Sequence, residues 1–209
     1  MKTRALLFLS LALTASSAFS QISIRLEDKG KGQNVDFFFE GDSMTAFAGQ
    51  LNFKDLTNNK MLQTYCVDLA NTISGGSTYN VNVSNTLGNP TFGKAGSIHA
   101  NGHANVTTNA AGAALQIAIW AARYGTDLST NTGSKFRLKN SWYQNNQSIV
   151  NQAIAMTNAG NANPANALLY NPHPIDCGQA QLGPVPEPAT FLALGVAVAG
   201  LARRRKRSS

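Results

Sequence analysis

The hydrophobic pattern of this chain changes its period once, and that change limits the possible folds. Beyond residue 110 apolar residues recur at helical spacing, which predicts helices at 110–124 and 143–159, with C-caps at Gly125 and Gly160. Before that point, short β-branched and aromatic runs are separated by Gly, Asn and Asp, which predicts strands at 22–26, 35–40, 45–53, 61–69 and 79–83. A last strand is predicted at 167–170. The predicted class is α+β, an antiparallel β-rich domain with two inserted helices.

The first twenty residues have the features of a secretory signal peptide. Two basic residues precede an apolar stretch at 5–13, and a small-x-small sequence ends at Ser20. This pattern predicts cleavage between Ser20 and Gln21. The apolar stretch is too short to span a bilayer, so we expect an exported chain that begins at Gln21.

The last 25 residues contain three features in sequence. The motif Pro186-Glu187-Pro188 is followed by a small and apolar run at 189–202, and then by a basic cluster of Arg203, Arg204, Arg205, Lys206 and Arg207. As a helix the apolar run would be about 21 Å long, shorter than the roughly 30 Å hydrocarbon core. The basic cluster predicts a membrane stop on the cytoplasmic side, with the rest of the chain outside.

Together these features resemble the PEP-CTERM sorting signal of Gram-negative bacteria, here at 185–209. The resemblance implies recognition by an exosortase and the export machinery, with the C-terminal transmembrane helix anchoring the protein transiently in the inner membrane. It also implies a final place at the cell surface or in the extracellular matrix, in association with biofilm and exopolysaccharide. An ordinary C-terminal membrane helix is the alternative. The predicted organisation is a signal peptide at 1–20, an ectodomain at 21–170, a linker at 171–184 and the sorting signal.

The charge of the ectodomain argues against nucleic-acid binding. The whole chain has a formal net charge of +7, from 17 Lys and Arg and 10 Asp and Glu. Seven of the basic residues and one acidic residue lie in the terminal segments, which leaves ten positive charges against nine negative ones. A nearly neutral body offers no basic face for phosphates. Its polarity comes instead from Asn, Ser, Thr and Gly, which suits a surface protein among polysaccharides.

The sequence lacks the common catalytic signatures, including the nucleophile elbow, the zinc-protease motif and the phosphate-binding loop. We therefore expect no enzyme, no cofactor and no metal site. His99 and His103 have a spacing that could bind a metal on a helix. Because Gly102 disfavours a helix and no further ligand lies nearby, they are predicted to be solvated loop residues.

Two cysteines and one glutamine are the most informative residues of the ectodomain. An even number of cysteines in an exported protein usually indicates a disulfide, here between Cys66 and Cys177. Gln116 lies within the most apolar run of the body, where an amide needs a hydrogen-bonding partner. The partner is either backbone or water, or the amide takes part in a covalent bond.

Tyr65-Cys66-Val67, followed fifty residues later by Leu115-Gln116 and then Trp120, resembles the thioester domains of bacterial surface adhesins. The resemblance implies an internal thioester with Cys66 as thiol donor and Gln116 as acyl donor. It also implies a pocket in which Tyr65 and Trp120 exclude water. An amine-bearing surface or a polysaccharide would then be the partner.

The resulting hypothesis is an adhesive, exosortase-sorted surface protein with a Cys-Gln thioester. The alternative is a non-covalent structural or polysaccharide-binding module with a Cys66–Cys177 disulfide. An enzyme acting on polysaccharide is disfavoured because the sequence shows no pair of carboxylates at a recognisable site.

Overall fold

The computed structural model describes residues 20–174 and 178–185. The predicted signal peptide up to residue 19 and the predicted sorting helix lie outside the described residues, whereas Ser20, directly before the predicted cleavage point, begins the first strand. Within the described residues, no helix is long and apolar enough to cross a membrane. The fold is α+β, as the change in hydrophobic period predicts.

In the part of the chain that the structure describes, seven antiparallel strands form one sheet, in the order β2-β3-β7-β6-β4-β1-β5. An additional pairing between β2 and β1 closes six of them into a ring, with β5 attached to the end of β1. The strands are β1 (Ser20–Phe39), β2 (Asp42–Asp55), β3 (Lys60–Cys66), β4 (Thr78–Asn85), β5 (Phe136–Leu138), β6 (Leu168–Pro172) and β7 (Gln181–Gly183).

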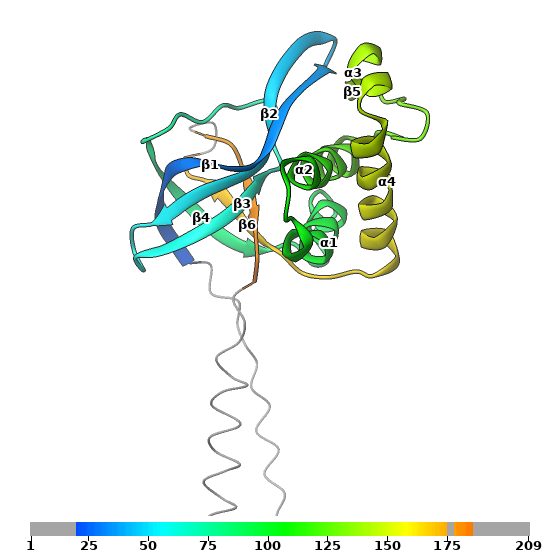
Figure 1. The fold of residues 1–209 in the computed structure, drawn as a ribbon. Helices are drawn as coiled ribbons and strands as arrows, with labels where there is room; N and C mark the ends of the chain where they lie inside the picture. The colour runs from blue at the N-terminus through cyan, green and yellow to red at the C-terminus, as the bar shows by residue number, and fades with distance from the viewer. Residues whose placement is uncertain (1–19, 175–177, 186–209) are drawn as a thin grey trace, which may run out of the picture.

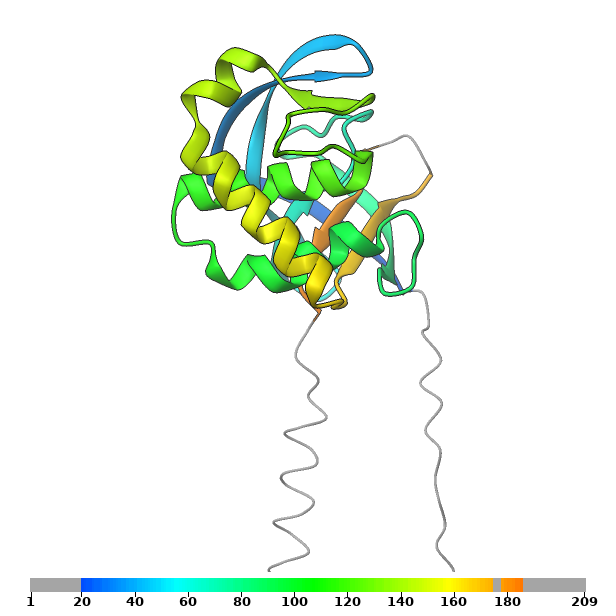
Figure 2. The same ribbon diagram turned by 90° about the vertical axis from the view of Figure 1, so that its right-hand side faces the viewer.

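The helices lie together against one side of the sheet (Figure 1), and Figure 2 shows this side facing the viewer. Contacts join α2 to α1 and α4, and α2 also packs on β1 and β2. The helices are α1 (Gly93–Gly102), the 3-10 turn η1 (His103–Asn105), α2 (Asn109–Tyr124), α3 (Asn140–Asn145) and α4 (Gln147–Ala162).

The sequence of β1 explains how one strand serves two cores. Ile22, Ile24 and Leu26 alternate along its first half and face a small core with Phe53 of β2 and Val81 of β4. The later part of the strand contributes to a larger core between sheet and helices, through Val35, Phe37 and Phe39. Register shifts between Leu26 and Asp28 and between Lys29 and Gly32 separate the two parts.

Helix α2 is delimited by its own sequence. The side chain of its N-cap residue Thr108 accepts a hydrogen bond from the backbone N–H of Ala111 at 3.1 Å. Its C-cap, Gly125, has φ of 71°, the left-handed conformation that glycine adopts without strain. The C-cap predicted at Gly125 is therefore confirmed.

The structure corrects the predicted number of helices and the end of one of them. The described residues contain four α-helices, because α1 and α3 accompany the two predicted. Helix α4 continues through Gly160 and ends at Ala162. Gly160 is not a C-cap but a point where α4 lies close to α1, since a Cβ there would lie 2.8 Å from the Cα of Ile98 in α1.

The segment predicted as a linker, 171–184, also differs. Part of it completes β6, and Gln181–Gly183 forms β7, which lies between β3 and β6 in the middle of the sheet. Leu182 in β7 is fully buried. The compact ectodomain therefore extends to residue 183.

Candidate functional site

Cys66 and Gln116 meet where the end of β3 packs against the middle of α2. Both side chains are almost completely buried, at 4% and 1% exposure. The backbone N–H of Cys66 donates to Oε1 of Gln116 at 3.0 Å, and Nε2 of Gln116 donates to the carbonyl oxygen of Cys66 at 2.6 Å. The amide of Gln116 thus forms the two hydrogen bonds with the Cys66 backbone that a neighbouring strand would form. Both polar atoms of the buried amide therefore have a hydrogen-bond partner.

The thiol of Cys66 is free in this structure and donates to the carbonyl oxygen of Asp68 at 2.7 Å. Cys177 lies outside the described residues, so the disulfide between the two stays a prediction. Burial raises the pKa of the Cys66 thiol to about 12, and contacts with the Asp68 backbone and the Trp120 side chain lower it only partly. The thiol is therefore protonated at neutral pH.

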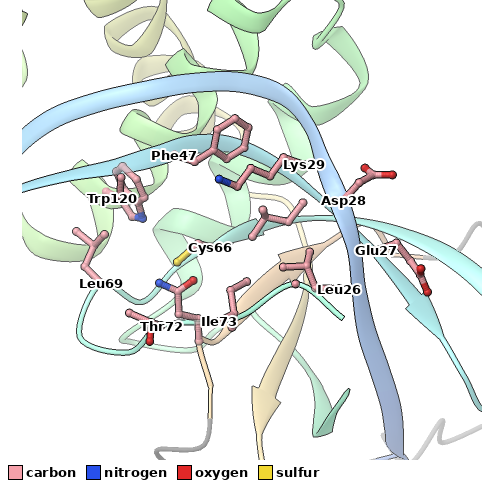
Figure 3. Close-up of a pocket in the computed structure, with 14 residues that line it drawn as sticks. Leu26, Glu27, Asp28, Lys29, Phe47, Cys66, Leu69, Thr72, Ile73 and Trp120 are labelled. Atoms are coloured by element: carbon pink, nitrogen blue, oxygen red, sulfur yellow. The ribbon is translucent and has the colours of Figure 1, made fainter. Parts of the chain in front are cut away.

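Trp120 lies one helical turn after Gln116, and its indole nitrogen points toward the sulfur of Cys66 (Figure 3). Its ring contacts Phe37 and Phe136, with centroids 5.5 and 5.8 Å away. These contacts fix the indole against the thiol. Trp120 therefore occupies the position predicted for a pocket residue.

Tyr65 lies elsewhere. It is buried, but it does not line the cavity beside Cys66, and its ring is 5.6 Å from that of His99 in α1. Successive side chains of a strand point to opposite faces, which accounts for the difference between the two neighbours. The structure thus brings together Cys66, Gln116 and Trp120, and it places Tyr65 in the core behind them.

A cavity of about 390 Å³ opens beside the sulfur of Cys66 (Figure 3). Most of its wall is apolar, from Leu26, Phe47, Leu51, Leu69, Ile73 and Trp120. The hydroxyl oxygen of Tyr124 accepts the backbone N–H of Leu69 at 2.9 Å and so holds one side of the wall in place. Apart from Trp120, sequence patterns did not indicate these wall residues, because they come from β1, β2 and the loop after β3.

The two histidines correct the sequence prediction. His99 lies in α1 with 0% exposure, and its ring stacks on that of His103 with centroids 5.0 Å apart. Neither ring nitrogen of His99 has a hydrogen-bond partner among the described residues. Burial lowers the pKa of His99 to about 3, so the ring is neutral. No group of three or more potential metal ligands occurs in the described part of the chain.

Comparison with protein families agrees with this geometry. The family model of the thioester domain matches residues 63–162, which include Cys66, Gln116 and Trp120. This region resembles a thioester domain. The thioester-domain match begins at β3, so the strands β1, β2, β6 and β7 that complete the sheet lie outside it. No curated protein and no solved structure matches the chain.

The second family match lies at the C-terminus. Residues 184–207 match the PEP-CTERM protein-sorting motif. The motif supports export and a transient membrane-anchored state, and it implies processing by an exosortase. It begins directly after β7. The predicted motif residues Pro186, Glu187 and Pro188 and the basic cluster 203–207 lie within this match, outside the described residues.

Proposed function

We propose that the exported ectodomain forms a thioester between Cys66 and Gln116, and that this bond attaches the protein covalently to a nucleophile of a surface or matrix. The observation that carries the proposal is the pair of hydrogen bonds between the Gln116 amide and the Cys66 backbone. They hold the carboxamide against the residue that bears the thiol. A fixed approach of this kind supplies much of what an intramolecular acyl transfer requires.

The hydrogen bonds also suit the reaction. When the Cys66 sulfur adds to Cδ of Gln116, negative charge develops on Oε1, which the Cys66 N–H already contacts at 3.0 Å. The thiol proton passes to Nε2, the C–N bond breaks, and ammonia leaves. A C–S bond replaces the C–N bond. The buried, apolar surroundings then slow hydrolysis of the product.

The thioester would be used once. An external nucleophile entering through the cavity attacks the acyl carbon, the C–S bond breaks, and the sulfur of Cys66 takes up a proton. The acyl group of Gln116 remains bonded to the nucleophile. Because the acyl donor is consumed, we propose an adhesive protein and not an enzyme. Association with biofilm or exopolysaccharide is the role that fits a sorted, covalently attached surface protein.

The mass of the purified protein tests the proposal. One extra residue is placed ahead of Gln21, because an N-terminal glutamine also loses ammonia on cyclisation. We expect a deficit of about 17 Da that Cys66→Ala and Gln116→Ala both abolish, and a methylamine adduct at Gln116. A full mass with an unmodified Gln116 contradicts the proposal.

The same measurement detects the alternative module. A deficit of about 2 Da that reductant reverses identifies the Cys66–Cys177 disulfide. In that case Cys66 cannot serve as thiol donor, and the protein is a non-covalent structural or polysaccharide-binding module.

A further inference from the structure

Three charged residues of β1 line the cavity beside Cys66, namely Glu27, Asp28 and Lys29. Two of them are engaged elsewhere. The carboxylate of Glu27 forms an ion pair with Arg25 at 2.7 Å, and that of Asp28 accepts a hydrogen bond from the side chain of Asn52. In Figure 3 both carboxylates point away from Cys66.

Lys29 differs from both. Its side chain extends over the cavity on the side of Trp120 and Cys66 (Figure 3), with Nζ 5.2 Å from the centroid of the Phe47 ring. A cation over an aromatic face is attracted by the ring quadrupole, so Phe47 favours this position. Lys29 forms no ion pair among the described residues. Its ammonium group is therefore not held by a carboxylate of the described residues.

The backbone of β1 explains this orientation. Register shifts lie on both sides of the dipeptide Asp28-Lys29, between Leu26 and Asp28 and between Lys29 and Gly32. Such irregularities re-aim side chains relative to a regular strand. They turn the ammonium group toward the cavity while the neighbouring carboxylate points outward.

We propose that Lys29 is the specificity-determining residue of this site, and that it selects nucleophiles carried beside an anionic group, such as the hydroxyl or amine of an acidic sugar. The inference rests on the proposed thioester. In the transfer to a hydroxyl, a C–O bond forms at the acyl carbon of Gln116 and the C–S bond breaks. The hydroxyl proton passes to the sulfur of Cys66. A protonated or otherwise cationic acceptor is disfavoured, because it approaches the unpaired ammonium group of Lys29.

Three probes with the same aminooxy nucleophile test the proposal on the purified, exported protein. Aminooxyacetate is anionic, methoxyamine is neutral, and 2-(aminooxy)ethylamine is cationic. The rate of each adduct at Gln116 is followed by mass. We expect the anionic probe to react fastest and the cationic one slowest, with about a three- to tenfold change for each unit of charge. This difference decreases at high salt because the charges are screened.

Variants assign the effect to Lys29. Lys29→Gln is expected to remove most of the charge dependence, and Lys29→Glu to reverse it. Lys60→Gln makes the same change in net charge at the start of β3, six residues and roughly 20 Å from Cys66. This control should keep the wild-type order.

Several outcomes overturn the inference. One is the same charge dependence in the wild type and Lys29→Gln. Another is a 17 Da deficit that resists every probe and disappears in Lys29→Gln, because Lys29 itself is then the acyl acceptor. If no deficit exists, the proposed function fails. In that case the ratio of Cys66 alkylation by iodoacetate to alkylation by iodoacetamide shows separately whether Lys29 draws anions to the cavity.

Discussion

Gln116 lies in the most apolar part of α2, and both of its hydrogen bonds go to the backbone of one residue, Cys66. Gln116→Glu keeps the size of the side chain and removes the N–H donor. The carbonyl oxygen of Cys66 then loses its partner and faces a carboxylate. In the Cys66→Ala background, where no thioester forms and the amide is retained, we expect the free energy of unfolding in denaturant to fall by about 1–3 kcal/mol. With Cys66 present, we expect the loss of ammonia to disappear.

The matched control for this change is Gln152→Glu, which makes the same substitution on the exposed side of α4. Its effect on stability should stay within about 0.5 kcal/mol. Equal effects at the two positions would show that the hydrogen bonds of Gln116 contribute nothing specific.

The high pKa of Cys66 gives a prediction about its reactivity. Only the thiolate reacts. As long as the pH is below the pKa, the fraction of thiolate rises about tenfold for each unit by which the pH increases. Because burial raises this pKa to about 12, alkylation of Cys66 should still accelerate above pH 9 in folded protein that carries Gln116→Ala and Cys177→Ser, in which neither the thioester nor the disulfide can form. The denatured chain serves as the control, with a rate that levels off near the ordinary thiol pKa of about 8.5. A plateau near that value in the folded protein would contradict the structure.

Because His99 is buried, we expect the stability of the folded protein to fall in acid. Its folded pKa is lowered by burial, with a smaller contribution from the neighbouring His103. Below about pH 6.5 the unfolded chain binds a proton that the folded chain excludes, so stability falls by at most about 1.4 kcal/mol per pH unit down to about pH 3. His99→Phe should flatten this part of the curve of unfolding free energy against pH. His103→Gln should flatten it less than His99→Phe does, because burial lowers the pKa of the half-buried His103 ring as well, but His99 is the more deeply buried of the two.

Only some residues of the candidate site could be predicted from the sequence. Cys66, Gln116 and Trp120 were predicted because the short motifs around them resemble those of thioester domains, and the structure places them together. Lys29 and Phe47 could not be predicted, because the pairing of β1 with β2 brings them to the cavity. The buried position of His99 was also missed, since Gly102 was read as a helix breaker and instead ends α1.

At the scale of elements, α2 and β1 approach so closely that only glycine fits between them. A Cβ at Gly112 would overlap the carbonyl oxygen of Lys31, in the irregular part of β1. Gly112→Ala should therefore push the helix from the strand and lower the free energy of unfolding by about 1–3 kcal/mol. The displacement also moves Gln116 relative to Cys66, so we expect slower loss of ammonia.

Gly93→Ala provides the comparison for that prediction. A Cβ there meets only the carbonyl oxygen of Thr86, at an ordinary 3.4 Å, in the first turn of α1. Alanine restricts the unfolded chain more than glycine does, so this substitution should be neutral or stabilising by up to about 1 kcal/mol. Equal destabilisation by both substitutions would argue against close packing as the cause.

The elements that the sequence predicted are those with long, regular patterns. The strand pattern from 22 to 83 and the helix at 110–124 correspond to β1 to β4 and α2. The short elements α3, β5 and β7 were missed because three to six residues carry little periodicity. The segment 171–184 was predicted as a linker, whereas tertiary pairing with β3 and β6 makes part of it a central strand.

At the scale of the whole molecule, the sheet depends on its last strand. Removing residues 181–185 leaves Cys66 and Tyr170 without their backbone partner in β7 and exposes the core around Leu182. We expect a chain that ends at residue 180 to unfold at lower denaturant concentration than one that ends at 185, and to keep Gln116 unmodified. Equal stability of the two chains would contradict the central place of β7.

The position of β7 has a consequence for the order of events during export. Its residues are among the last of the ectodomain to leave the translocation channel, and the sorting motif follows them directly. The strand that holds Cys66 therefore stays incompletely paired until almost the whole chain has crossed. If the proposed acyl bond depends on this pairing, it forms only at the outer face of the membrane, after transport, and the unfolded chain in transit does not carry it.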